Sequence, residues 1–198
     1  MVVKAHGVEC SGCGRSPSSI GQTECEWCGN VILVSTFTSV DSMPMPMVNQ
    51  FAAANRNALQ KDPDNPRLNS SLGMCYLKLK LYDKALAAFE KAIEDNFDNP
   101  ETFFYAAVCV LGGKKAFLVQ RPQINKIEEY INAALMIEPR GIFHYFLAYI
   151  KYDYFERKYL NTSPNYREAM ATANQMGLSP FDIEQLYGVL GVSRPDEL

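Results

Sequence analysis

The sequence has little of what enzymes use for proton transfer. Its 198 residues include only two histidines, His6 and His144, and a single tryptophan. It contains no glycine-rich phosphate loop, no His-Glu-x-x-His and no Gly-x-Ser-x-Gly. Paired carboxylates such as Glu128-Glu129 fall on polar helix faces, where a solvated side chain is the ordinary state. These absences predict a protein that is not an enzyme.

Long apolar runs and a secretory leader are also missing. No run of 18 apolar residues occurs, so we expect no membrane span. Residues 1–8 carry one lysine and no apolar segment, so we expect no signal peptide. Cys75 and Cys109 stand alone in helical patterns, where a reduced thiol serves as a small apolar residue. We therefore expect a cytoplasmic protein without disulfides.

Two pairs of cysteines stand near the N-terminus, Cys10 with Cys13 and Cys25 with Cys28. Two residues separate the members of each pair, so both thiolates can face one ion, and the glycine after each pair lets the chain curl. Four thiolates in a tetrahedron suit Zn²⁺ and leave no open position for a substrate. We predict a structural zinc site. We also expect Cys25→Ser to unfold only residues 1–40, because metal binding would supply most of their folding energy.

An excess of positive charge is absent as well. The chain has 19 Lys and Arg against 22 Asp and Glu, a net charge of −3. Residues 1–40 hold two cations against three carboxylates, and four thiolates around one Zn²⁺ would add about −2. Phosphate binding needs the opposite sign. Nucleic acid is therefore an unfavoured partner, and a nucleic-acid-binding ribbon is only a second alternative.

Residues 8–38 resemble the zinc-ribbon family, in which two knuckles are held on short hairpins. A turn at Gly29-Asn30 and a β-branched run over 31–38 predict the closing strand. The segment also resembles rubredoxin-like modules, which hold one iron for electron transfer. Those modules usually carry a proline inside the second knuckle and an aromatic after the first, whereas this chain has Glu26-Trp27 and Arg15. Zinc is thus favoured, and iron electron transfer is the alternative.

Trp27 and His6 lie beside the knuckles, and the sequence allows two roles for each. Trp27 is predicted either to pack in the small core of the module or to stand exposed as a docking anchor. His6 lies four residues before Cys10, and we expect an exposed histidine there, since four thiolates already close the metal shell.

The composition changes over residues 41–48, where Pro44 and Pro46 alternate with methionines. Two prolines two residues apart oppose a helix and favour an extended strap. We therefore predict three parts: a four-cysteine zinc ribbon (1–40), a Pro/Met linker (41–48) and an α-helical repeat domain (49–198) that ends in a capping helix.

The segment 66–99 has the spacing of a helical repeat, with Leu72-Gly73, Tyr76, Ala85, Phe89 and Ala92. Gly73 would let two antiparallel helices approach, and aromatic side chains would fill the space beside it. This spacing resembles the tetratricopeptide repeat, a helix–turn–helix unit of about 34 residues. Further helices are predicted over 50–61, 101–111, 123–137, 141–159, 164–176 and 181–190. The expected fold class is mostly α, with a small β ribbon at the N-terminus and an all-α array after it.

The resemblance also implies which side chains would face a partner, because the first helix of each repeat lines the concave side. In the first repeat these are Arg67, Ser70, Met74 and Lys78. In the later ones we predict partner binding by Phe104, Val108, Phe143 and Phe146, a greasy groove suited to an amphipathic helix or apolar peptide. The alternative is that the last helix, 181–190, fills this groove.

A long turn over 112–121, here called the inserted turn, is the second candidate surface. Lys114, Lys115 and Phe117 give it a basic and apolar tip. Long turns in compact domains are often functional. The sequence as a whole predicts a non-enzymatic adaptor or scaffold that holds protein partners together, as one component of a larger assembly.

Overall fold

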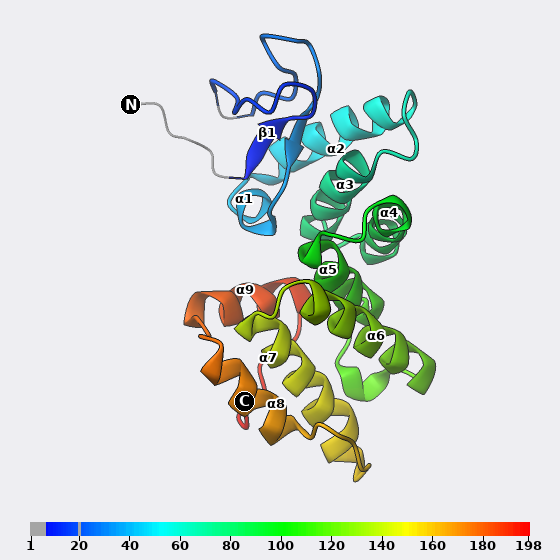
Figure 1. Cartoon of the computed structure of the whole chain (residues 1–198), viewed down its shortest axis with the longest axis vertical. Helices are drawn as coiled ribbons and strands as arrows, with labels where there is room; N and C mark the ends of the chain where they lie inside the picture. Colours follow the sequence, from blue (N-terminus) through cyan, green and yellow to red (C-terminus); the bar gives the residue numbers. More distant parts are fainter. Residues whose placement is uncertain (1–6, 20) are drawn as a thin grey trace. The chain divides into compact units, whose positions relative to one another are not determined.

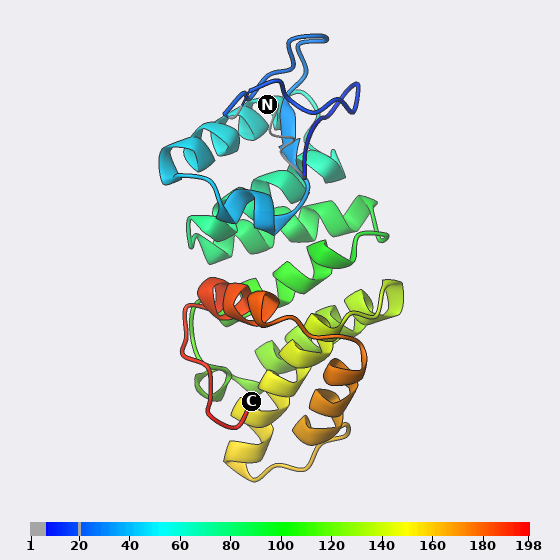
Figure 2. The ribbon, with the colours of Figure 1, turned by 90° about the vertical axis from the view of Figure 1, so that its left-hand side faces the viewer.

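The computed structural model describes residues 7–19 and 21–198 of the chain, and they are mostly α-helical, as predicted. The only sheet among them is a two-stranded one near the N-terminus. The chain divides into two compact units, Met1–Phe97 and Asp98–Leu198, each of which is described by itself. The course of the helices within each unit can be followed in two views (Figures 1 and 2). This division differs from the predicted boundaries, because the cysteine segment and the first helices share one unit.

The first unit opens with the ribbon. Strand β1 (Val8–Cys10) pairs antiparallel with β2 (Ile32–Val34), and an isolated bridge joins Glu24 to Val31. The closing strand is shorter than the predicted 31–38, because the chain turns into helix α1 (Phe37–Asp41). Phe37 and Val40 on this helix are buried, so the apolar end of the run packs as a helix turn.

The predicted extended linker is wrong from Met45 onward. Helix α2 (Met45–Leu59) begins there, five residues before the predicted start at residue 50. Pro44 is the N-cap and Pro46 lies in the first turn, where a backbone N–H has no partner within the helix in any case. The two prolines therefore start the helix instead of preventing it.

The predicted repeat is present as α3 (Pro66–Lys78) and α4 (Tyr82–Asp95), which pack against each other. The Asn65 side chain caps α3 by accepting hydrogen bonds from the backbone N–H groups of Arg67 and Leu68. A Cβ atom on Gly73 would lie 2.5 Å from the ring of Phe89. The close approach predicted for this glycine is therefore confirmed.

The second unit continues with two more helix pairs. Helix α5 (Pro100–Leu111) packs on α6 (Arg121–Ile137), with the short helix η1 (Ala116–Leu118) between them. Helix α7 (Gly141–Ile150) runs on through the π-helix η2 (Lys151–Phe155) and the 3-10 helix η3 (Glu156–Lys158), and it packs on α8 (Tyr166–Gln175). Helix α9 (Pro180–Leu190) follows and contacts α5. Each predicted helix of this unit is present within a few residues of its predicted bounds.

The core of the second unit is rich in aromatic rings. The Phe104 ring lies 4.7 Å from that of Phe143 and 5.6 Å from that of Phe146, measured between centroids. The rings of Tyr145 and Tyr149 both meet that of Tyr187, which belongs to α9. Helix α9 thus packs against α5 and α7. No helix in the described part of the chain is long and apolar enough to cross a membrane.

Candidate metal centre and binding surfaces

The two cysteine pairs fold into matching knuckles. The Gly14 N–H donates to the Cys10 carbonyl, and the Gly29 N–H donates to the Cys25 carbonyl in the same way. Cys10 and Cys25 then donate their own N–H groups to the carbonyls five residues later. Both glycines adopt positive φ, +69° and +72°, a region that suits a residue without a Cβ atom. The sequence prediction that these glycines let the chain curl is confirmed.

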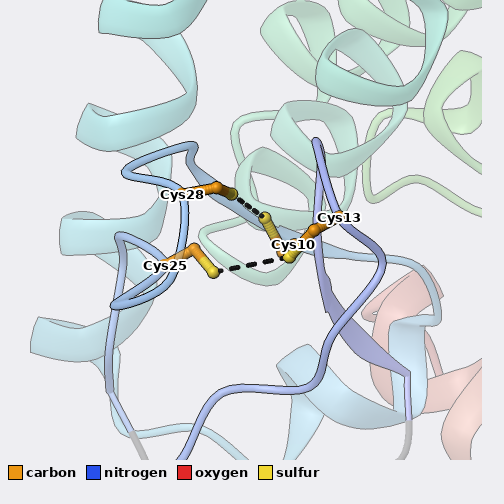
Figure 3. A group of neighbouring side chains, drawn as sticks. All are labelled: Cys10, Cys13, Cys25 and Cys28. Carbon is orange, nitrogen blue, oxygen red and sulfur yellow. Dashed lines mark hydrogen bonds between the residues drawn. The ribbon is translucent and has the colours of Figure 1, made fainter.

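The four sulfur atoms converge between the knuckles (Figure 3). The Cys10 and Cys28 sulfurs lie 3.3 Å apart, the Cys13 and Cys25 sulfurs 3.7 Å apart, and all four lie within 4.8 Å of one another. A disulfide would need about 2.05 Å, and all four thiols are free. Sulfurs at the corners of a tetrahedron with metal–sulfur bonds of about 2.3 Å would lie about 3.8 Å apart. The four cysteines therefore lie close enough together to hold one tetrahedral metal ion.

The surroundings of the two exposed thiols shift their pKa values in opposite directions. Cys10 and Cys25 are buried, whereas Cys13 and Cys28 are exposed. The backbone N–H of Asn30 and the Cys10 thiol lower the pKa of Cys28 to about 6. For Cys13, the backbone N–H of Arg15 acts to lower the pKa, but desolvation and the three neighbouring thiols raise it to about 11. At neutral pH these surroundings favour the thiolate form of Cys28 and the thiol form of Cys13.

Trp27 stands at the tip of the second knuckle. Its side chain is 66% exposed, so the interpretation that it packs in a small core is wrong. The Arg15 guanidinium of the first knuckle lies 4.7 Å from the centroid of its ring, a cation–π contact. The docking-anchor interpretation stays a prediction. His6, the other side chain in question, lies outside the described residues.

The ribbon covers one side of helix α3. The Val34 N–H of β2 donates to the Ser71 hydroxyl at 2.9 Å in a buried contact. Arg67 pairs with Glu9 of β1 at 2.7 Å, and Lys78 pairs with Asp41 of α1 at 2.6 Å. Arg67 and Lys78 were predicted to face a partner, but within this unit they hold the chain's own ribbon and α1.

The predicted apolar groove of the second unit is closed. Phe104, Val108, Phe143 and Phe146 are at most 4% exposed, so they are core residues and the prediction that they line an open groove is wrong. The alternative prediction agrees with the structure, since α9 contacts α5 and its Tyr187 meets two tyrosines of α7. The apolar residues of α9, from Ile183 to Leu190, are buried within the second unit.

The inserted turn is ordered by a buried carboxylate. Lys114 and Lys115 are exposed, and Phe117 is half-buried. The Phe117 N–H donates to Asp153 Oδ2 at 2.8 Å, and the Ala116 N–H donates to the Tyr149 hydroxyl at 3.4 Å. Binding of a partner by Lys114, Lys115 and Phe117 stays a prediction, but these residues do lie at the surface of one fixed turn.

Sequence reasoning missed the residues that hold this turn. Asp153 lies in the π-helix η2, and the spacing of apolar residues in the sequence does not predict a π-helix. Its carboxylate pairs with Arg157 four residues later. The signal that was available is this Asp-to-Arg spacing of four along a predicted helix.

Comparison with known proteins found one family model that matches part of the chain. Residues 52–102 match the tetratricopeptide repeat. This tetratricopeptide repeat match covers the second half of α2, all of α3 and α4 and the start of α5. No curated protein matches the chain.

Two solved structures resemble the chain in fold. One is described as MamA MSR-1 C2, with a TM-score of 0.47 and 18% identity over 71% of this chain and 84% of the other. The second is described as MamA AMB-1 C2221, with a TM-score of 0.48 and 18% identity over 70% and 81%.

Proposed function

We propose that the protein is a non-enzymatic adaptor in which a structural tetrathiolate zinc site supports a tetratricopeptide-type interaction domain. The observation that carries this proposal is the attachment of the cysteine ribbon to the repeat. The ribbon that holds the thiols also lies on α3, through Val34, Glu9 and, at α1, Asp41. A metal held there would stabilise the ribbon, which presents Trp27, and the helix α3 on which the ribbon packs.

Zinc is the metal that the ligand set favours. Four thiolates fill a tetrahedron, so no coordination position would remain for a substrate or a reactive water. Such a closed site contributes to folding, not to chemistry. Four free thiols in this arrangement also fit a reducing compartment, and we propose the cytoplasm.

The proposed partners are proteins, and they would bind on surfaces other than the filled groove. Two exposed places are supported by the structure: Trp27 at the knuckle tip, and Lys114 with Lys115 on the inserted turn. An exposed tryptophan is a typical anchor of a protein interface, and exposed lysines attract a partner of opposite charge.

The first test is the metal itself. Elemental analysis of the full chain purified without added metal should find zinc in equimolar amount and a colourless protein. If the protein instead contains iron and shows the visible absorption of an iron–thiolate centre, the adaptor function would be overturned in favour of electron transfer.

The second test is partner recovery. Cross-linking and mass spectrometry with the full chain should recover a defined set of proteins. Trp27→Ala or Lys114→Gln/Lys115→Gln should reduce that set. As a control, Lys61→Gln/Lys84→Gln makes the same charge change at exposed sites of the first unit and should leave the set intact. No reproducible partner for the parent chain would contradict the adaptor function.

A further inference from the structure

Five cations gather around the inserted turn and the end of the α7 segment. We call them the basic surface: Lys114, Lys115, Arg121, Arg157 and Lys158. Three of them are held over aromatic rings. Arg157 and Lys158 lie 4.6 and 5.0 Å from the Phe117 ring centroid, and Arg121 lies 4.7 Å from that of Phe155. Contact with a ring fixes the charge in place without neutralising it.

Fewer carboxylates than cations lie at this surface, namely Asp153, Asp196 and Glu197. Asp153 pairs with Arg157, but this carboxylate is 1% exposed and its second oxygen accepts from the Phe117 N–H. Lys114, Lys115 and Lys158 form no ion pair with any carboxylate in the part of the chain that the structure describes. The basic surface is therefore positive in a chain whose net charge is −3.

A polar cavity of about 500 Å³ opens at this surface. Its lining includes Lys115, Arg157 and the buried Asp153, together with Tyr149 and Tyr152, and residues 193–197 form the rest of the wall. Its size and its polar groups would admit one or two carboxylate side chains from outside.

The chain already places an acidic segment there. The Tyr152 hydroxyl donates a hydrogen bond to the Glu197 carboxylate, and the Arg157 charge attracts the same carboxylate, so the pKa of Glu197 is lowered. Asp196 lines the same wall and is exposed. Two adjacent acids of this chain thus rest against the basic surface, which shows the kind of side chain that the surface accepts.

We propose that the basic surface binds an acidic peptide segment of a partner protein, and that Asp196 and Glu197 compete with that segment for the cavity. This proposal rests on the proposed adaptor function and names the chemistry of its partner. A peptide is favoured over a nucleic acid because Asp196 and Glu197 on the cavity wall would repel a continuous line of phosphates, whereas spaced carboxylates can avoid them.

The experiment measures peptide binding to the full, metal-loaded chain by fluorescence anisotropy. The probe is a labelled peptide of aspartate, glutamate and serine, and its control replaces the acids with asparagine and glutamine. Lys114→Gln/Lys115→Gln should weaken binding of the acidic peptide roughly three- to tenfold, the effect of losing two exposed ion pairs. Lys61→Gln/Lys84→Gln should leave binding unchanged. Asp196→Asn/Glu197→Gln should strengthen it by a similar factor, and added salt should weaken it.

Each other outcome overturns a stated part of the proposal. Equal affinity for the acidic and the amide peptides, or equal losses in both lysine pairs, would overturn the basic surface as the site. Unchanged affinity in the Asp196→Asn/Glu197→Gln variant would overturn the competition. Tighter binding of a single-stranded oligonucleotide or of phosphatidylserine vesicles, lost in Lys114→Gln/Lys115→Gln, would overturn the peptide as ligand. If the peptide fails while cross-linked partners are still recovered, the adaptor function stands without this surface.

Discussion

At the scale of single residues, the positive φ angles of the two knuckle glycines shape the turns that bring the four cysteines together. Gly29 has a φ of +72°, and a Cβ atom there would meet nothing within 4 Å. The cost of a side chain at this position is therefore purely conformational. The turn needs glycine at this position because glycine adopts a positive φ without strain, and not because a Cβ atom would clash with a neighbour.

Gly29→Ala is expected to destabilise the metal-loaded first unit by about 1–2 kcal/mol, because an L-residue is strained in the left-handed region. Gly188→Ala is the matched control, since Gly188 lies inside α9, is exposed and also has open space around it. There the same change should stabilise the second unit by about 0.5–1 kcal/mol. Thermal unfolding of both variants checks the two signs. An unaffected Gly29→Ala protein would show that the knuckle tolerates another turn.

The two exposed thiols should react at different pH. While the knuckles keep their fold without metal, the pKa of Cys28, lowered to about 6, favours its thiolate at pH 7, whereas the pKa of Cys13, raised to about 11, favours its thiol. Since the thiolate is the nucleophile, iodoacetamide should modify Cys28 first. As the pH rises, Cys28 alkylation should level off above about pH 7 while that of Cys13 keeps rising. Peptide mass spectrometry over a pH series measures both rates, and equal rates at pH 7 would contradict the expectation.

At the scale of elements, the contact between β2 and α3 depends on one hydroxyl. The Ser35 N–H of the ribbon donates to the Gly7 carbonyl, so in the alternating antiparallel ladder Val34 points its own N–H away from β1. The Ser71 hydroxyl is its partner, and both residues are 1% exposed. This hydrogen bond therefore satisfies the free edge of the strand.

Ser71→Ala should leave the Val34 N–H buried without a partner and cost about 1–3 kcal/mol. The loss should appear in urea unfolding of the first unit only. Ser16→Ala serves as the control, since Ser16 is exposed and belongs to the same unit. A loss below about 0.5 kcal/mol would indicate that water reaches Val34.

The helices were predictable from sequence because apolar spacing and capping residues determine them locally. Asn65, Asn99 and Ser179 each cap a helix that begins at a proline, and all three starts were found within one residue of the prediction. The linker was mispredicted because the same residue, proline, breaks a helix in its interior and favours one in its first turn. Only the neighbouring packing distinguishes the two cases.

The convergence of the four cysteines was predictable because each pair, two residues apart, lies within a single knuckle. The closed groove was not, because the burial of Phe104 depends on its packing against Phe143 and Phe146, some 40 residues later in the chain. The basic surface was only half found for a similar reason. Lys114 and Lys115 adjoin in sequence, whereas Arg157 joins them through a π-helix that shifts the helical register.

At the scale of the whole molecule, the two units should respond differently to loss of metal. Because β2 contacts α2 and α3, chelation or Cys25→Ser is expected to loosen these helices as well as the ribbon. This expectation replaces the one from sequence, that only residues 1–40 would unfold. Hydrogen exchange should therefore rise over β1, β2, α2 and α3, and stay unchanged in Asp98–Leu198.

The reverse experiment is the control, since adding zinc back to the chelated wild-type chain should restore protection. Acid should act like the chelator, because the ligands bind metal as thiolates and protonation releases it. Increased exchange confined to residues 7–36 would instead show that the helices stand without the ribbon.

The filled interior of the second unit has a consequence for how related sequences would differ. Where an array keeps its inner side open, the residues on that side change as partners change. Here Phe104, Phe143 and Phe146 pack against one another in the core, so relatives should exchange them for side chains of similar volume. Diversity that tracks a change of partner should collect instead at positions such as Lys114, Lys115 and Trp27, where substitution leaves the interior undisturbed.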